Sequence, residues 1–190
     1  MMLLKPTYTI DELVTRCKAG ERKAQEILYK LLASKMLAVC MRYAADKAEA
    51  EDMLQNGFVK VFKNISDYRG DGVFEGWVRR IMVHSAIEYH RKYHRSLQLM
   101  DVTDSGYEPS VNAAALATLG AKDLMGFIQT LPHNYKMVFN LYAIEGYSHK
   151  EIGEMIGITE GASKSQLSRA RSILKEMVIK MENKRYGNAG

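Results

Sequence analysis

The sequence predicts an all-α protein made of two small helical domains joined by a flexible linker. The chain of 190 residues holds only three prolines, Pro6, Pro109 and Pro132, and each lies where a helix boundary is expected. No segment alternates polar residues with β-branched or aromatic ones, as a half-buried strand would. Apolar residues instead recur every three to four positions, which is the spacing that buries one face of a helix.

The composition excludes several classes of protein. Hydrophobic residues make up 47% of the chain and charged residues 26%, an ordinary globular balance with a net charge of +5. No apolar stretch approaches the roughly 18 residues that a membrane span needs, and the first residues lack the pattern of a secretory signal. Two cysteines, Cys17 and Cys40, form neither a disulfide framework nor a zinc-finger spacing. A soluble, cytoplasmic and mildly basic protein is expected.

The N-terminal domain, residues 1–95, is expected to contain four helices. Thr9 and Glu12 form a capping box that opens the first helix, and Gly20 ends it. The second helix covers residues 22–45, and its inward stripe is Ile27, Leu28, Leu31 and Leu32. The third covers residues 48–65, and its apolar face is Ala50, Met53, Leu54, Phe58, Val61, Phe62 and Ile65. Paired glycines interrupt the pattern at 68–72, and a fourth helix covers 74–95 with Trp77, Val78 and Ile81 inward.

A change of composition marks the linker, residues 96–121. This segment has no Lys or Arg but contains Asp101, Asp104, Glu108 and Pro109, so we expect an acidic flexible connection, with part of a helix at 113–119. The C-terminal domain, residues 122–185, is expected to begin with helices over 122–131 and 134–143. A disordered tail is expected at 186–190.

The most specific local signal is a helix-turn-helix in the C-terminal domain. Ser148 and Glu151 form a second capping box, Gly157 ends that short helix, and Thr159 caps a long helix two residues later. The residues expected on the buried stripe of the long helix are Leu167, Ala170, Leu174, Met177, Val178 and Met181. Those expected on its outward face are Lys164, Ser165, Ser168, Arg169, Ser172 and Lys175.

The outward face of this long helix suits duplex DNA. Short polar side chains at its start fit base edges in a major groove, and the later cations fit phosphates. Residues 161–190 contain seven Lys or Arg against two Glu, so this end also gains affinity from counterion release. A solvated face of a structural helix would carry a similar charge, but the two capped helices and their tight turn favour nucleic-acid binding.

The helix at 74–95 offers a second candidate surface. Aromatic residues are interleaved with its cations, a mixture that suits single-stranded nucleic acid. The cations are Arg79, Arg80, Arg91, Lys92 and Arg95, and the aromatics are Trp77, Tyr89 and Tyr93. Aromatics at helical spacing are also typical of a core. His90 and His94 are four residues apart and could form a metal pair, but no third ligand has a convincing spacing. We therefore expect no metal and no cofactor.

Four motifs follow one another along the chain and together resemble one protein family. They are residues 50–58, residues 68–71 with Phe74, Trp77, Arg80 and Ile81, residues 131–139 with 145–152, and residues 157–165 with Leu167 and 169–171. In this order they resemble regions 2.2, 2.3 to 2.4, 4.1 and 4.2 of a bacterial RNA polymerase sigma factor of the extracytoplasmic-function type, the smallest class of the sigma-70 family. The sequence departs from the family pattern at Asn56, Gly57, His84 and Ala162-Ser163.

The resemblance implies a promoter-specificity subunit rather than an enzyme, with no substrate of its own. The implied partners are core RNA polymerase, at its β′ clamp helices and β flap, promoter DNA, and an anti-sigma factor. The implied polymerase contacts are Asp52, Gln55, Asn56 and Val59. The implied −10 contacts are Tyr68, Arg69, Gly70, Asp71, Phe74, Arg80, His84, Arg91 and Lys92. The implied −35 contacts are Glu160, Ala162, Ser163, Lys164, Ser165, Ser168, Arg169 and Arg171.

Two other functions remain open at this point. One is a free-standing helix-turn-helix regulator that binds duplex DNA as a dimer without polymerase. The other is a metal-dependent nuclease that uses the histidines of the 74–95 helix.

Overall fold

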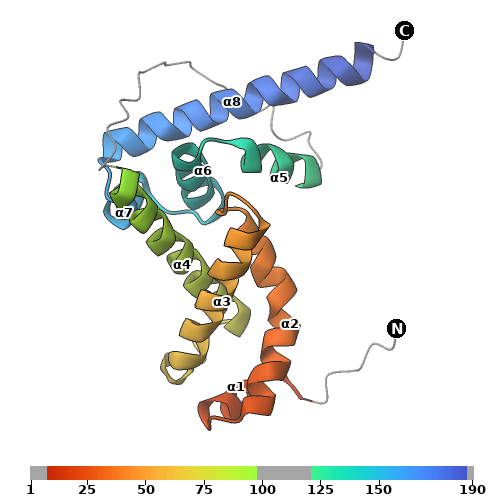
Figure 1. The fold of residues 1–190 in the computed structure, drawn as a ribbon, viewed down its shortest axis with the longest axis vertical. Helices are drawn as coiled ribbons and strands as arrows, with labels where there is room; N and C mark the ends of the chain where they lie inside the picture. Colours follow the sequence, from red (N-terminus) through yellow and green to blue (C-terminus); the bar gives the residue numbers. More distant parts are fainter. Residues whose placement is uncertain (1–7, 98–120, 188–190) are drawn as a thin grey trace. The chain divides into compact units, whose positions relative to one another are not determined.

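The computed structural model describes residues 8–97 and 121–187, and within these ranges the chain is helical with no β-strand (Figure 1). The prediction of an all-α fold is confirmed. The chain divides into two compact units, one up to Ala86 and one from Ile87 onward. Ser96 and Leu97 complete one described helix and Ala121 begins another, while the rest of the expected linker, including 113–119, lies outside the described residues.

The N-terminal unit is built from amphipathic helices and one 3-10 turn. In chain order they are α1 (Ile10–Lys18), α2 (Arg22–Met41), α3 (Lys47–Lys63), the 3-10 turn η1 (Ile65–Asp67) and the part of α4 (Phe74–Leu97) that precedes Ile87. The capping box of Thr9 and Glu12 is present, and Gly20 follows α1 with a φ of +80°. Both predicted features are confirmed.

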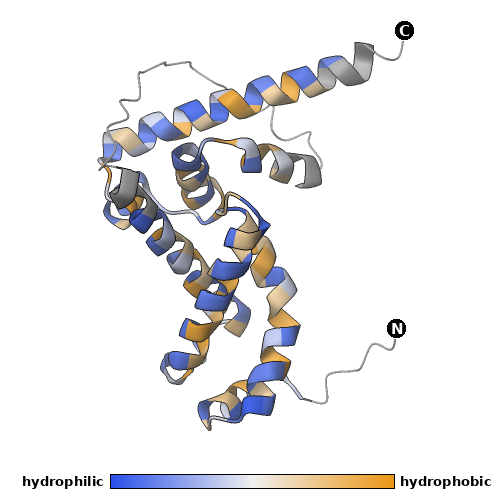
Figure 2. Ribbon diagram, in the orientation of Figure 1, coloured by the Kyte–Doolittle hydropathy of each residue, from blue (hydrophilic) through white to orange (hydrophobic). Residues whose placement is uncertain are grey.

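The core of this unit lies where α2 packs against α1 and α3. The buried side chains of α2 and α3 include Leu28, Leu32, Met36, Met53, Leu54, Phe58 and Val61. From α4, Val78 and Met82 are fully buried. Hydrophobic and hydrophilic residues alternate along each of these helices, the pattern of amphipathic elements (Figure 2).

Two details of the N-terminal prediction were wrong. Leu31 is 40% exposed, because it lies at the edge of a stripe centred on Leu28, Leu32 and Met36. The second helix ends at Met41 rather than at residue 45. The chain leaves the helix there so that Asp46 can cap α3, and the Glu49 carboxylate accepts a hydrogen bond from the Ala45 backbone.

The C-terminal unit is organised around its last helix. Its elements are α5 (Ala121–Thr130), α6 (His133–Phe139), the π-helical turn η3 (Asn140–Ile144), α7 (His149–Ile156) and α8 (Glu160–Gly187). Both α6 and α7 pack against α8, and Ile152, Leu167 and Leu174 are buried between them. The helix predicted over 134–143 widens into the π-helical turn after Phe139, which sequence periodicity does not reveal.

Candidate functional site

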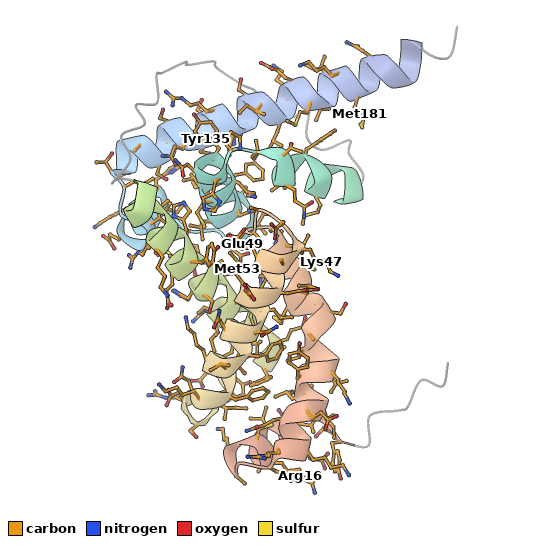
Figure 3. The ribbon with its side chains drawn as sticks, viewed as in Figure 1. Arg16, Lys47, Glu49, Met53, Tyr135 and Met181 are labelled. Atoms are coloured by element: carbon orange, nitrogen blue, oxygen red, sulfur yellow. The ribbon has the colours of Figure 1, made fainter. Side chains whose placement is uncertain are left out.

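The outer face of α3 carries the four residues predicted to contact polymerase. Asp46 accepts a hydrogen bond from the Glu49 backbone at 2.9 Å, which fixes the start of the helix. Lys47, Glu49 and Met53, labelled in Figure 3, mark its N-terminal half. The side chains that point away from the buried stripe are all exposed: Asp52, Gln55, Asn56 and Val59. Val59 is 67% exposed, so this polar face includes one apolar group for a partner to cover.

A groove of about 250 Å³ lies beside this face. It is lined by Tyr29, Ala33, Ser34, Leu37, Glu51, Leu54 and Gln55. The Tyr29 ring packs 4.7 Å from that of Phe58, measured between centroids. Gln55 belongs both to the groove and to the predicted polymerase face, so the two surfaces are continuous. Sequence reasoning missed the groove because the α2 residues that line it show no special pattern.

An aromatic cluster holds the loop between η1 and α4. The rings of Tyr68 and Phe74 lie 5.0 Å apart and edge to face, and Trp77 lies 5.6 Å from each. The Tyr68 hydroxyl donates to the Gly72 carbonyl at 2.6 Å, closing the loop on itself. Gly70 and Gly72 have φ values of +86° and +100°, which favour glycine. The loop therefore has one preferred shape.

Tyr68 and Phe74 form the buried base of this loop, although both were predicted to meet DNA. The predicted contacts on its outer side, Arg69, Gly70 and Asp71, are exposed. The remaining predicted −10 contacts, on α4, are also exposed: Arg80, His84, Arg91 and Lys92. Arg80 and His84 are four residues apart and share one face of α4, whereas Lys92 is turned by roughly 100° from its neighbour Arg91 and lies on another face.

Lys18, in the last turn of α1, contacts the same loop. Its Nζ donates to the Tyr68 carbonyl at 2.6 Å and lies 5.9 Å from the centre of the Tyr68 ring. Sequence reasoning missed this residue, because a lysine in the last turn of a helix is already explained by the helix dipole.

Helices α7 and α8 form the predicted helix-turn-helix. The Ser148 hydroxyl accepts from the Glu151 backbone at 3.3 Å, and the Glu151 carboxylate accepts from the Ser148 backbone at 2.8 Å. Gly157 ends α7 in the left-handed conformation with a φ of +78°. The Thr159 hydroxyl accepts from the Ala162 backbone at 3.1 Å and caps α8. Both predicted helix starts and the glycine turn are confirmed.

The first turns of α8 present most of the predicted −35 contacts. Glu160 and Lys164 are exposed and form an ion pair of 2.6 Å. Those with partly exposed side chains are Ala162, Ser165, Ser168, Arg169 and Arg171. Ser163 is fully buried, and its hydroxyl lies 2.9 Å from His149 Nδ1, so it faces α7 rather than solvent.

Ser172 is also buried, so its expected place on the outward face was wrong. The buried stripe of α8 is wider than the sequence suggested, because α6 and α7 both pack against this helix.

Two arginines of α8 lie against tyrosines of the same unit. Arg169 donates to the Tyr135 hydroxyl at 3.3 Å, and the Arg171 guanidinium lies 5.7 Å from the centre of the Tyr142 ring (Tyr135 is labelled in Figure 3). Tyr142 in turn stacks on His149 with 4.4 Å between ring centroids. These contacts hold the two guanidinium groups close to the helix and restrict their side-chain rotamers.

Two titratable groups at the start of α8 have shifted pKa values. Burial lowers the pKa of His149 below its ordinary value, and the positive charge of Lys164 adds to the effect. The hydrogen bond and charge of Lys164 lower the pKa of the Glu160 carboxyl. The lowered pKa of His149 favours its neutral imidazole, and the lowered pKa of Glu160 favours its carboxylate.

In the described part of the chain, no three His, Cys, Asp or Glu residues gather closely enough to hold a metal ion. The side chain of His94, one half of the possible metal pair, lies outside that part. Across residues 8–97 and 121–187, no helix combines the length and the apolar character that a membrane crossing requires.

Two family models match the chain, one in each half. "Sigma-70 region 2" matches residues 28–96 and "Sigma-70, region 4" matches residues 121–174, so together they cover more than half of the sequence. The first includes α3, the aromatic loop and most of α4, and the second includes the helix-turn-helix.

Similar proteins are RNA polymerase sigma factors. The RNA polymerase sigma-H factor of Pseudomonas aeruginosa is 26% identical over 175 residues, which are 86% of this chain and 91% of the relative. The ECF RNA polymerase sigma-E factor of Escherichia coli is 25% identical over 181 residues, which are 90% and 94%. Among solved structures, the sigma factor RpoE of Bartonella quintana, determined with the anti-sigma factor NepR, aligns with a TM-score of 0.46 and 21% identity over 82% of this chain and 96% of that one.

Proposed function

This chain belongs to the extracytoplasmic-function group of the sigma-70 family, and on that basis we propose that it directs core RNA polymerase to a set of −35/−10 promoters in response to a stress or other signal. It binds core polymerase reversibly, recognises promoter DNA and is controlled by an anti-sigma factor. One observation carries this function: matches to regions 2 and 4 occur in order along one chain, which supports two separate contacts with a promoter. Sigma factors in general are not enzymes. We extend this to the present chain and place it in the cytoplasm with the polymerase.

We assign polymerase binding to the outer face of α3. An exposed valine among Asp52, Gln55 and Asn56 gives a small apolar centre with a polar surround, which supports this assignment. Val59→Ala and Asp52→Ala are each expected to weaken core binding about five- to twentyfold, the effect of truncating a moderate interface residue. Val73→Ala is the matched control, because Val73 is also a largely exposed valine but lies in the aromatic loop, away from α3. Competition with a labelled sigma factor for core polymerase measures the affinities; equal values for the three variants would remove the assignment.

We assign recognition of the melted −10 strand to the aromatic loop and to the exposed residues of α4, which are Arg80, His84, Arg91 and Lys92. A loop of fixed shape can offer a pocket to an unstacked base, and the cations behind it can follow the backbone. Since Tyr68 and Phe74 are buried, we assign them the support of the pocket and leave direct contact to the exposed residues. His84→Ala is expected to reduce base discrimination in this element, as measured by initiation from promoters with single −10 substitutions.

We assign recognition of the −35 duplex to α8. Lys164, Ser165, Ser168, Arg169 and Arg171 are accessible to a major groove or its phosphates. Lys164→Ala is expected to weaken −35 recognition by about 1–3 kcal/mol and to relax base preference if its contact is to a base. Lys180→Ala removes one exposed charge further along α8 and should leave base preference unchanged.

One experiment separates this function from a free-standing DNA-binding regulator. Core polymerase is mixed with the chain and with promoter fragments, and binding of the chain alone to the same duplexes is measured in parallel. We expect new initiation with polymerase and only weak binding without it. Tight, sequence-specific duplex binding by the chain alone, without new initiation, would favour the regulator.

A further inference from the structure

We propose that Lys18 is a positioning residue for the aromatic loop, so that helix α1 takes part in recognition of the −10 element. The inference rests on the function proposed above for that loop. α1 ends before residue 28, where the match to region 2 begins, so that match assigns no role to this helix.

Lys18 fixes one end of the loop through a backbone contact. Its ammonium donates to the Tyr68 carbonyl at 2.6 Å. This carbonyl belongs to the peptide that leads into Arg69, the first exposed residue of the loop. The contact therefore restrains the direction in which the chain leaves the buried aromatic cluster. A charged donor makes this bond stronger than one between neutral groups.

Tyr68 transmits the restraint to the other end of the loop. Its hydroxyl donates to the Gly72 carbonyl at 2.6 Å, and its ring packs edge-on against Phe74, the first residue of α4. Lys18 also lies 5.9 Å from the centre of that ring. One side chain thus joins α1, the start of the loop and the start of α4.

The backbone of Lys18 is itself firmly placed. The neighbouring Cys17 is buried, together with Leu13 and Val14 on the same face of α1. Arg16, also in α1, forms an ion pair of 3.5 Å with Glu21, which lies beyond the end of the helix. Lys18 is an exposed residue, but the buried face of α1 anchors its backbone, so its ammonium can hold the loop in place before DNA arrives.

The helix dipole alone does not account for this arrangement. A lysine in the last turn gains from the dipole wherever its side chain points, whereas this ammonium reaches a carbonyl 50 residues away in the sequence. Without this contact the loop would lose more conformational entropy when it binds a base, while the core-binding and −35 surfaces would be unaffected.

Three variants of the full chain test the proposal in reconstituted holoenzyme. Lys18→Met keeps the aliphatic length and removes the donor, Lys18→Arg keeps a charged donor, and Lys63→Met removes one exposed charge at the end of α3 as the matched control. The probe is the single-stranded non-template −10 segment of a promoter at which the wild-type holoenzyme initiates. A second probe has an abasic site at each position in turn.

We expect Lys18→Met to bind the single strand about five- to tenfold more weakly and to discriminate less against the abasic probes. Lys18→Arg and Lys63→Met should stay within about twofold of wild type on the same measure. Core affinity and thermal midpoint should be equal in all four proteins, which a general loss of stability would not allow. If the Met variant fails to fold, Lys18→Ala, which also removes the donor and suits a helix, takes its place.

Several results would overturn the role of Lys18. One is that Lys18→Met binds the single strand and discriminates against the abasic probes as well as Lys63→Met does, whether or not both have lost affinity. Another is that the loss in Lys18→Met is matched by a loss of core affinity or by a lower thermal midpoint. A wild-type holoenzyme that initiates nowhere would refute the proposed function instead, so the two failures are distinguishable.

Discussion

Gly153 sits where the turn of the helix-turn-helix closes on α7, and its replacement by alanine probes that geometry. A Cβ at this position would lie 2.7 Å from the Ile158 carbonyl oxygen and 3.6 Å from the Glu160 nitrogen. The Gly153 carbonyl also accepts hydrogen bonds from the Gly157 and Ile158 backbones at 2.9 and 3.1 Å. The turn therefore wraps around this residue on two sides, and no flexible side chain can move aside.

The expected magnitude follows from two opposed effects. Relieving the contact requires the turn to shift by roughly 0.5 Å, and overpacking of this kind costs about 2–3 kcal/mol when backbone must move. Alanine gains about 1 kcal/mol over glycine within a helix. The net loss is about 1–2 kcal/mol, which lowers the melting temperature of a unit of this size by about 5–15 °C.

Thermal unfolding followed by two probes measures this effect. Trp77, the single tryptophan, lies in the N-terminal unit, so its fluorescence reports that unit, while far-UV circular dichroism reports both. Gly153→Ala should lower the melting temperature of the C-terminal unit, seen by circular dichroism, and leave the fluorescence transition of the N-terminal unit unchanged. Gly161→Ala is the control: its Cβ would meet nothing closer than the Thr159 hydroxyl at 4.0 Å, so it should stabilise by about 0.5 kcal/mol. A Gly153→Ala protein as stable as wild type would refute the close packing of the turn.

Three further changes have expected outcomes. Because the pKa of His149 is lower in the folded protein, the unfolded chain binds a proton there at a higher pH than the folded chain does. The free energy of unfolding of the C-terminal unit should therefore fall as pH drops below about 6.5, and His149→Gln should reduce that fall. The same pH dependence in wild type and variant, measured by urea unfolding, would contradict this. Burial raises the pKa of Cys17 and Cys40 to about 11, so alkylation at pH 8 should be slow in native protein and fast in urea. Gly57→Ala, whose Cβ would overlap the Met82 sulfur, should cost the N-terminal unit about 1–2 kcal/mol; an unshifted Trp77 transition would show that Met82 moves aside freely.

Capping residues and glycines made much of the fold predictable. Thr9, Ser148 and Thr159 act through hydrogen bonds within four residues, so their effect can be recognised from local sequence. Gly157 ends α7 for an equally local reason. The exposed face of α3 was predictable from periodicity, because the apolar residues Met53, Leu54 and Phe58 define the opposite, buried side of the helix.

Features that depend on packing between distant segments could not be predicted in this way. Ser163 is polar and lies within a polar stretch, but it is buried because α7 packs against α8, and its hydroxyl pairs there with His149 Nδ1. Tyr68 and Phe74 flank a glycine loop, and only the packing with Trp77 places them at its base. The reach of Lys18 to Tyr68 spans 50 residues and leaves no periodic signal.

Run-off transcription with purified core RNA polymerase, with and without this chain, tests the central claim most directly. Promoter fragments from the chain's own genome serve as templates. We expect new transcripts from a discrete set of fragments, and a shared −35/−10 pattern upstream of their start sites. Core polymerase that binds the chain without new initiation, or that does not bind it at all, would contradict the assignment as a promoter-specificity subunit.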